Sequence, residues 1–195
     1  MKNKAFKHFK LITTHKAYVF RNCVKAGLIW RGVKHDMSKY SPVEFFESVK
    51  YFTGTDSPIN TCKKAKGWSK AWMHHKGRNT HHWQYWLDNT DEGIVPRIMP
   101  FEDCVEMLCD QFAAGKAYKK ENWSLDYQRE WWEKKINVHK RFMHPVVFVF
   151  MNNIYKNTLE YTHPEDFFDE VFNYDNLEDW YYWYKEKWED YEYVD

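Results

Sequence analysis

The chain has no uninterrupted apolar segment long enough to cross a membrane, and only 7 of its 195 residues are glycine and only 4 are cysteine. A membrane-spanning helix needs about 20 consecutive apolar residues, whereas the stretch from Val146 to Met151 is far shorter. The first residues do not form the apolar core of a signal peptide, because Lys10, Thr13 and Thr14 interrupt them. We therefore expect a cytoplasmic protein with no membrane partner.

The cysteines and the charge balance exclude further classes of protein. The four cysteines form no C-x-x-C pair, so neither a zinc finger nor a disulfide framework is expected, and free thiols fit a reducing compartment. The formal net charge is +1, whereas domains that bind duplex nucleic acid by bulk electrostatics carry a strong basic excess. The charge is uneven, with eleven Lys and Arg against three Asp and Glu in the first fifty residues. This basic part could attract an anionic substrate.

Aromatic residues are abundant, since Phe, Trp and Tyr make up 20% of the chain. The core must therefore be built largely from rings, and every buried Trp N–H and Tyr O–H needs a partner. No segment alternates long enough to require a strand, so the predicted fold is all-α, a compact helical bundle. We expect residues 1–160 to form this bundle. Residues 161–195 would form an acidic, aromatic, partly helical extension packed on it, with a surface that could bind a protein partner.

Helix boundaries follow from local signals. The sequence Ser41-Pro42-Val43-Glu44 is a strong helix start, with Ser as N-cap, Pro at the first position and Glu at the third. Glycine and proline predict loops over 53–67 and 89–100. The expected helices span 4–27, 41–52, 69–87 with a break at Gly77 or Asn79, 101–117, one or two within 124–160, and part of 164–195.

Histidines and aspartates gather in the first part of the chain, where seven of the ten histidines precede residue 110. His35 and Asp36 are adjacent, so at a turn or helix end both side chains could converge on one ion. His15 lies on the apolar face of the predicted helix 4–27 and therefore points toward the interior. Imidazole and carboxylate together are common ligands of transition metals. We expect such a site around the His35-Asp36 pair.

Two further predicted helices carry matching side chains. In the segment 69–87, one helical face carries His75, Asn79 and His82, and a second carries His74, Arg78 and His81. Gly77 leaves open which histidine pair converges. In the helix 101–117, Asp103, Glu106 and Asp110 line a face that could approach a cation.

Each of these features also has a purely structural interpretation. His15 alone could be a core histidine, Asp36 a helix cap and Glu44 the carboxylate of a capping box. The acidic face of 101–117 could simply be solvated. The tryptophans near the histidine segment are Trp68, Trp72, Trp83 and Trp86; they could stack a nucleobase, but packing is the more common role. Surface or core positions are expected for His8, His139, His144 and His163.

The order His15, His35-Asp36, His75 with His81 or His82, and Asp110 resembles the H…HD…H…H…D pattern of the HD-domain metal-dependent phosphohydrolases, an all-α superfamily. Lys39 resembles the lysine of the HD-x-G-K form, with Ser38 in place of the glycine. The stretch from His15 to about Tyr118 resembles more closely the bacterial and phage family DUF5662. The matching pieces are Gly27-Leu28, HDMSKYSPVEF, AWMHHKGRNTHHWQYW and MPFEDCVEMLCD.

The superfamily resemblance implies one ion held by His15, His35, Asp36 and Asp110, and a second held by His75 with His81 or His82. Each would be Mn, Fe, Co, Ni or Zn. A metal-activated water would attack a small phosphorylated substrate such as a nucleotide. The candidate catalytic residues are Lys39 and Arg78 for the phosphate charge, Glu44 for a proton or a histidine N–H, and Asn79. Two features depart from the superfamily pattern: the spacing between His75 and His81 is short, and Gln84 stands where a carboxylate is expected. Both concern the binding of the second ion.

Two functions of other classes fit the same residues. The first is an HD-like di-iron centre that activates oxygen. The second is a non-enzymatic protein in which the ion staples the helices together and the aromatic C-terminal segment binds a protein. A closed site with no open coordination position would favour the staple.

Overall fold

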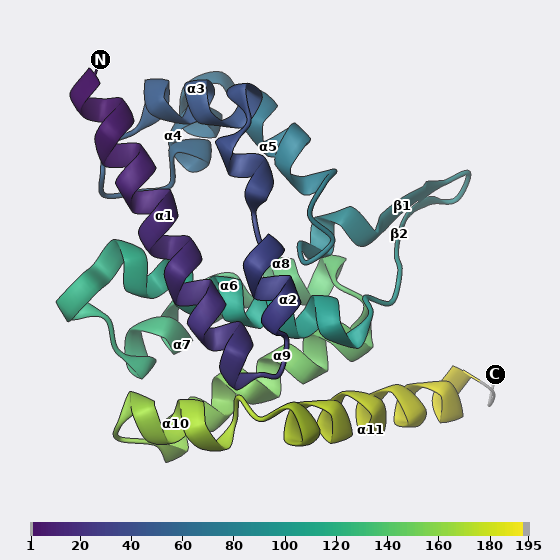
Figure 1. Ribbon diagram of the computed structural model, residues 1–195. Coiled ribbons are helices and arrows are strands. Elements are labelled where there is room, and N and C mark those ends of the chain that lie inside the picture. Colours follow the sequence, from purple (N-terminus) through teal and green to yellow (C-terminus); the bar gives the residue numbers. More distant parts are fainter. Residues whose placement is uncertain (1, 193–195) are drawn as a thin grey trace.

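The computed structural model of the chain describes residues 2–192 (Figure 1). This range folds into eleven α-helices with one small hairpin, which confirms the all-α prediction. The helices are α1 (Lys2–Lys25), α2 (Ile29–Lys34), α3 (Pro42–Tyr51), α4 (Pro58–Lys66), α5 (Lys70–Lys76), α6 (Phe101–Lys119), α7 (Leu125–Glu133), α8 (Ile136–Phe142), α9 (Pro145–Asn157), α10 (Pro164–Glu170) and α11 (Tyr174–Glu192). The strands are β1 (Leu87–Thr90) and β2 (Gly93–Pro96), and short 3-10 turns are η1 (Met37–Tyr40), η2 (Trp83–Trp86), η3 (Lys120–Asn122) and η4 (Thr158–Glu160).

Several helix boundaries follow from residues with fixed backbone preferences. Proline occupies the first turn of α3, α4, α9 and α10, where its missing N–H costs no helical hydrogen bond. The side chains of Ser69 and Ser124 accept hydrogen bonds from the backbone N–H groups of Trp72 and Tyr127, which caps α5 and α7. Gly27 has a φ of +73° and lets the chain turn directly from α1 toward α2.

Two local predictions were wrong. The segment 53–67 contains α4, because Ser57-Pro58 starts a helix inside the expected loop. The segment 89–100 contains most of an antiparallel hairpin that pairs Leu87 with Pro96 and Thr90 with Gly93. The predicted start of α3 is confirmed, with Ser41 as N-cap residue, although the Ser41 side chain makes no capping hydrogen bond. The helix expected over 69–87 ends at Gly77, the break that the sequence had allowed.

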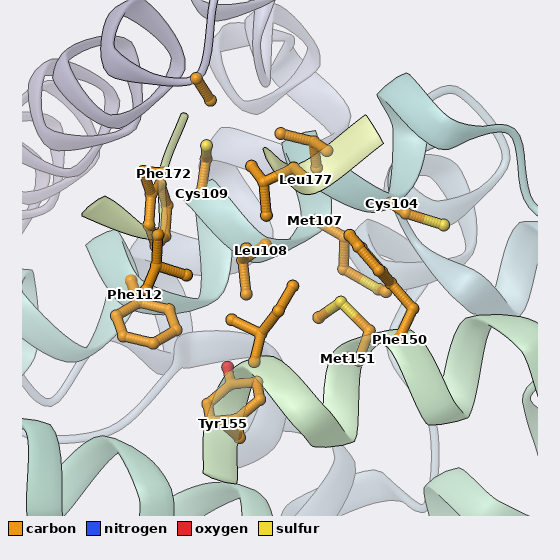
Figure 2. Close-up of a cluster of buried hydrophobic side chains, with 14 of the residues drawn as sticks. Cys104, Met107, Leu108, Cys109, Phe112, Phe150, Met151, Tyr155, Phe172 and Leu177 are labelled. Carbon is orange, nitrogen blue, oxygen red and sulfur yellow. The ribbon is translucent and has the colours of Figure 1, made fainter. Parts of the chain in front are cut away.

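Helix α6 lies between two differently composed layers. On one side it packs against α1, where the Asn22 side-chain amide donates to the Cys109 carbonyl over 3.1 Å. On the other side its apolar residues meet α9 and the α10–α11 segment, which runs along the lower edge of Figure 1. Figure 2 shows this contact, with Leu108 and Phe112 of α6 facing Met151 and Tyr155 of α9. The segment after residue 160 thus contributes to the core, while its separation as an extension stays a prediction.

No helix within residues 2–192 combines the length and the apolar character that crossing a membrane requires.

Candidate metal centre

Histidine and aspartate side chains from four separate parts of the chain meet between α1, α5 and α6. They form two groups, and within each group the candidate ligand atoms lie within 4.8 Å of one another. The first group is His15, His35, Asp36 and Asp110, and the second is Asp36, His75, His81 and His82. The structure therefore brings together all seven residues that the sequence suggested as ligands, and it places both His81 and His82 in the second group.

The first group closes around two carboxylates. The His15 Nε2 lies 3.0 Å from Asp110 Oδ1 and 3.8 Å from Asp36 Oδ2. The His35 Nε2 lies 3.0 Å from Asp36 Oδ2 and 3.4 Å from Asp110 Oδ1. Two imidazoles and two carboxylates from α1, the α2–η1 turn and α6 thus face a common point.

The second group is rich in histidine. The Nε2 atoms of His75 and His81 lie 3.3 Å and 3.5 Å from Asp36 Oδ1, and His82 Nε2 lies 2.8 Å from His75 Nε2. Asp36 therefore turns one oxygen to each group, Oδ2 to the first and Oδ1 to the second. A carboxylate in this position could bridge two ions.

The backbone at Asp36 explains how two neighbouring side chains can converge. Asp36 has φ 52° and ψ 27°, which is the left-handed region that non-glycine residues seldom occupy. The Lys16 ammonium donates to the carbonyls of Val33 and His35 over 2.8 Å and 2.6 Å and so fixes the turn from the α1 side. Such conformations persist where the surrounding structure determines them, often at functional sites.

Five ligand atoms in these groups are buried without a hydrogen-bond partner among the described residues. They are the Nε2 atoms of His15, His35 and His81 and both carboxylate oxygens of Asp36. The Lys39 ammonium pairs with Asp36 Oδ2 and offsets part of the cost of burying that carboxylate. Buried polar atoms are nevertheless nearly always hydrogen-bonded. The contacts among these five ligand atoms lack hydrogen-bond geometry. One cation at the middle of each group would instead give all of them a partner. These groups could hold metal ions.

Two glutamates orient the imidazoles from behind. Glu106 Oε1 lies 2.9 Å from His35 Nδ1 and 3.0 Å from His81 Nδ1. Glu44 Oε2 lies 2.8 Å from His75 Nδ1, and its Oε1 lies 2.6 Å from His74 Nδ1. An Nδ1–H that donates to a carboxylate leaves Nε2 as the free lone pair, and this is the usual arrangement behind metal-binding histidines. The predicted capping role of Glu44 in α3 is thus replaced by contacts with α5.

Charge keeps the carboxylates of the centre ionised. Burial alone would raise the pKa of Asp36, but the neighbouring charges of His35 and Lys39 hold that pKa well below its usual range. Burial opposes ionisation of Asp110 as well, and its contacts with His15 and His35 lower its pKa. The hydrogen bonds from His35 and His81 likewise outweigh burial and lower the pKa of Glu106. The carboxylates of the centre are therefore ionised, which is the form in which they bind a cation.

The candidate catalytic residues do not all lie together. Lys39 makes an ion pair with Asp36 and lines a cavity of about 200 Å³ that is bounded by His15, His75, His82 and Asp110. Arg78 instead lines a second cavity of about 310 Å³, next to His35 and His81. The structure thus does not bring Lys39 and Arg78 to the same cavity.

The Asn79 side chain makes hydrogen bonds to the local backbone and to a neighbouring side chain. Its side-chain amide donates to the His75 carbonyl over 2.7 Å and to the Ser38 hydroxyl over 2.9 Å. These bonds hold the turn that follows α5 and thereby position His75. A supporting role fits this geometry.

The sequence placed Glu106 on the face of 101–117 that could approach a cation, but it did not identify Glu106 as the partner of two histidines. In the structure its carboxylate contacts both His35 and His81. Asp103, one turn earlier, is 5% exposed and accepts hydrogen bonds from Arg31 and Thr80 over 2.7 Å and 2.6 Å. The acidic face is therefore buried, and the solvated alternative was wrong.

Comparison with curated proteins and with solved structures finds no match. A family model described as "Family of unknown function (DUF5662)" matches residues 4–157, which is well over half of the chain. The matched range includes both candidate groups, from His15 to Asp110. The chain therefore belongs to the DUF5662 family.

Proposed function

We propose that the protein is a metal-dependent phosphohydrolase that acts on a small phosphate ester. The observation that carries this proposal is the position of Asp36, whose two oxygens lie between two histidine groups. They have an ion pair to Lys39 but no hydrogen-bond partner among the described residues. The order of the ligands along the chain, with His15 first and Asp110 last, supports a likeness to the HD-domain phosphohydrolases. The family itself carries no assigned activity.

The ligand chemistry suits Mn, Fe, Co, Ni or Zn. Ions bound to these groups would lower the pKa of a water molecule and polarise phosphate oxygens. The two glutamates hold the imidazole Nε2 lone pairs in place, and Lys39 supplies a fixed positive charge beside Asp36. That ammonium is well placed to pair with a phosphate oxygen as negative charge grows on it.

The cavity that Lys39 lines gives a substrate access to both groups. His15 and Asp110 of the first group and His75 and His82 of the second all border it. The rest of its wall is mainly apolar and includes Leu11, Ile12 and Trp72. An apolar wall beside the ligands excludes water from the reacting groups and strengthens their electrostatic interactions. This open side favours an enzyme over a purely structural staple, whose site would be closed.

An HD-like di-iron oxygenase is the second candidate. The observation that favours it is the second group, in which three imidazoles accompany a single carboxylate, since such ligands suit redox-active iron as well as zinc. The two candidates differ in a simple property. An iron oxygenase would be coloured and sensitive to air, whereas a hydrolase would release phosphate under nitrogen.

Metal content of protein purified without chelator tests the centre directly. We expect two ions in the unaltered protein, one each in His15→Ala and His82→Ala, and none in Asp36→Ala, which removes the shared ligand. His163→Ala, which alters an exposed histidine outside the groups, is the matched control and should keep both ions. Unchanged metal content in Asp36→Ala would contradict the centre.

Phosphate release tests the reaction. The metal-loaded protein, supplied in separate samples with Mn, Co or Fe(II), is screened against nucleotides and small phosphomonoesters with and without oxygen. Release that needs no oxygen and disappears in Asp36→Ala supports the hydrolase. A loaded protein that releases no phosphate but consumes oxygen with a change of colour would establish the alternative.

A further inference from the structure

The cavity beside the candidate centre has a polar residue at a distance from the ligands. His8 lines this cavity, lies on α1 and precedes His15 by seven residues, so the two histidines share one face of the helix. Seven residues of α-helix rise about 10 Å. His8 therefore marks a place two turns away from the ligand set.

His8 is buried in a way that folding alone does not favour. Its side chain is 4% exposed, and its Nδ1 is buried without a hydrogen-bond partner among the described residues. The ring packs between Phe45 and Phe52, with centroid distances of 5.4 Å and 5.5 Å. A buried donor or acceptor left unpaired costs about 1–3 kcal/mol. A third phenylalanine would fill this position without that cost.

The imidazole of His8 is neutral near pH 7. Burial, with the nearby charge of Lys39, lowers its pKa from 6.5 to about 4. A neutral imidazole offers one donor and one acceptor and no charge. It suits a hydroxyl or carbonyl group of a ligand and not a second phosphate.

The cavity is small and differs between its two parts. Its volume is about 200 Å³, below the range of about 300–1,000 Å³ that is usual for sites of drug-sized ligands. One part carries the cation of Lys39 and the ligand groups, whereas His8 lies farther along α1, and the hydroxyl groups of Ser48, Ser57 and Tyr118 also line the cavity. Leu11, Ile12 and Ile59 line the wall as well. A compact molecule with one charged end and one neutral polar end fits this distribution.

We propose that His8 binds the substrate, and that the cavity takes a monophosphate ester of a small polyhydroxy compound whose hydroxyl group hydrogen-bonds to His8. This inference rests on the proposed phosphohydrolase function and narrows its substrate class. The phosphate lies at Lys39 and the ligand groups, and the hydroxylated end extends toward His8.

Two probes with the same number of carbons test the role of His8. Ribose 5-phosphate carries hydroxyl groups and n-pentyl phosphate carries none. Calorimetry on the metal-loaded protein gives the ratio of their dissociation constants, in which the common phosphate contribution cancels. We expect His8→Phe to reduce the preference for ribose 5-phosphate about tenfold, which corresponds to about 1.4 kcal/mol. Metal content and affinity for inorganic phosphate should stay unchanged.

His139→Phe is the matched control. His139 is 5% exposed and also has a buried, unpartnered Nδ1, but it packs against Trp132 and does not border the cavity. Its replacement should leave the ratio of dissociation constants as it is. His8→Gln keeps a hydrogen-bonding group and should restore part of the preference, and it also serves if His8→Phe fails to fold.

The outcomes separate the two proposals. An unchanged ratio in both His8 variants, or an equal fall in His139→Phe, would overturn the role of His8 while leaving the hydrolase intact. A metal-loaded protein that binds neither inorganic phosphate nor either ester would contradict the hydrolase itself, and the role of His8 with it. A merely structural His8 would alter thermal stability without altering the ratio.

Discussion

Helix α6 has two buried faces, and they differ in whether the buried polar atoms beside them have hydrogen-bond partners. On the side of α9, the polar ends of the large rings have partners: the Tyr155 hydroxyl donates to Gln111 over 2.7 Å and the Trp132 indole donates to Asn152 over 3.2 Å. On the side of α1, five buried ligand atoms around Asp36 have none among the described residues. Both regions exclude water, so the same physical rule applies to each. Within residues 2–192, the aromatic region leaves single atoms unpartnered, at His139 Nδ1 and Trp188 Nε1, whereas around Asp36 five such atoms gather within reach of a common ion, so the centre needs a further component.

The two regions therefore have different roles: the aromatic core stabilises the fold, and the fold in turn positions the residues of the candidate centre. The aromatic core gains free energy by burying rings and pairing their N–H and O–H groups. The centre buries carboxylates and imidazoles, and removing these groups from water costs free energy. Contacts with Glu44, Glu106 and Lys39 offset part of that cost. Natural proteins give up stability in this way at sites that serve function.

Removing a ring from the core should have the largest effect on stability. Phe112 is fully buried and stacks on Tyr155 and Phe167, with centroid distances of 5.3 Å and 5.4 Å. We expect Phe112→Ala to lower the free energy of unfolding by about 3–5 kcal/mol, through lost burial and the cavity left behind. Urea denaturation followed by circular dichroism measures this change.

The contrast between the aromatic core and the candidate centre also predicts that Phe112→Ala leaves the metal content unchanged. The folded fraction should keep the metal content of the unaltered protein, because Phe112 belongs to the hydrophobic core, which includes none of the seven candidate ligands. Leu159→Ala, at a side chain that is 66% exposed, is the control and should change stability by less than about 0.5 kcal/mol. Loss of metal from folded Phe112→Ala would show that the two regions are not independent.

A smaller effect is expected from the carboxylate behind the histidines. Glu106→Gln keeps the shape of the side chain but removes the charge that faces His35 and His81. Changes of this kind typically lower metal affinity about 10-fold to 100-fold. Competition with a chromophoric chelator measures the affinity. Glu102→Gln is the control on the same helix, since Glu102 is half-exposed and contacts Arg31. Equal effects of the two substitutions would mean that bulk charge, and not orientation of the imidazoles, controls binding.

The sequence predicted those parts of the molecule that depend on local signals. Helices α1 and α6 carry long periodic patterns with clear ends, and the start of α3 is marked by Ser41-Pro42. His15 and Asp110 could be related to the His35-Asp36 pair because each lies on a definable helix face and the chain order resembles a known pattern. Helix α4 was missed because Gly54 and Gly67 outweighed the Ser57-Pro58 start.

The rest of the centre depends on tertiary contacts that periodicity does not encode. His81 and His82 both reach Asp36 or His75 because the chain leaves the helix at Gly77 and turns, so neither helical face applied. The sequence left open whether Glu106 and Asp103 lie on a solvated face or on one that approaches a cation, and the contacts from α2 and the turn after α5 decide this. The convergence of His35 and Asp36 requires a left-handed backbone at an aspartate, and a sequence pattern does not specify this.

The smallest predicted effect compares two serines at helix starts. The Ser124 side chain caps α7 by accepting from the Tyr127 N–H over 3.1 Å, so Ser124→Ala should cost about 1 kcal/mol. The Ser41 hydroxyl makes no capping bond and is buried without a partner among the described residues. Ser41→Ala removes no hydrogen bond and should therefore leave the free energy of unfolding within about 0.5 kcal/mol of the unaltered protein. Parallel urea titrations decide the matter: a Ser41→Ala cost equal to that of Ser124→Ala would mean that the Ser41 side chain caps α3 in solution.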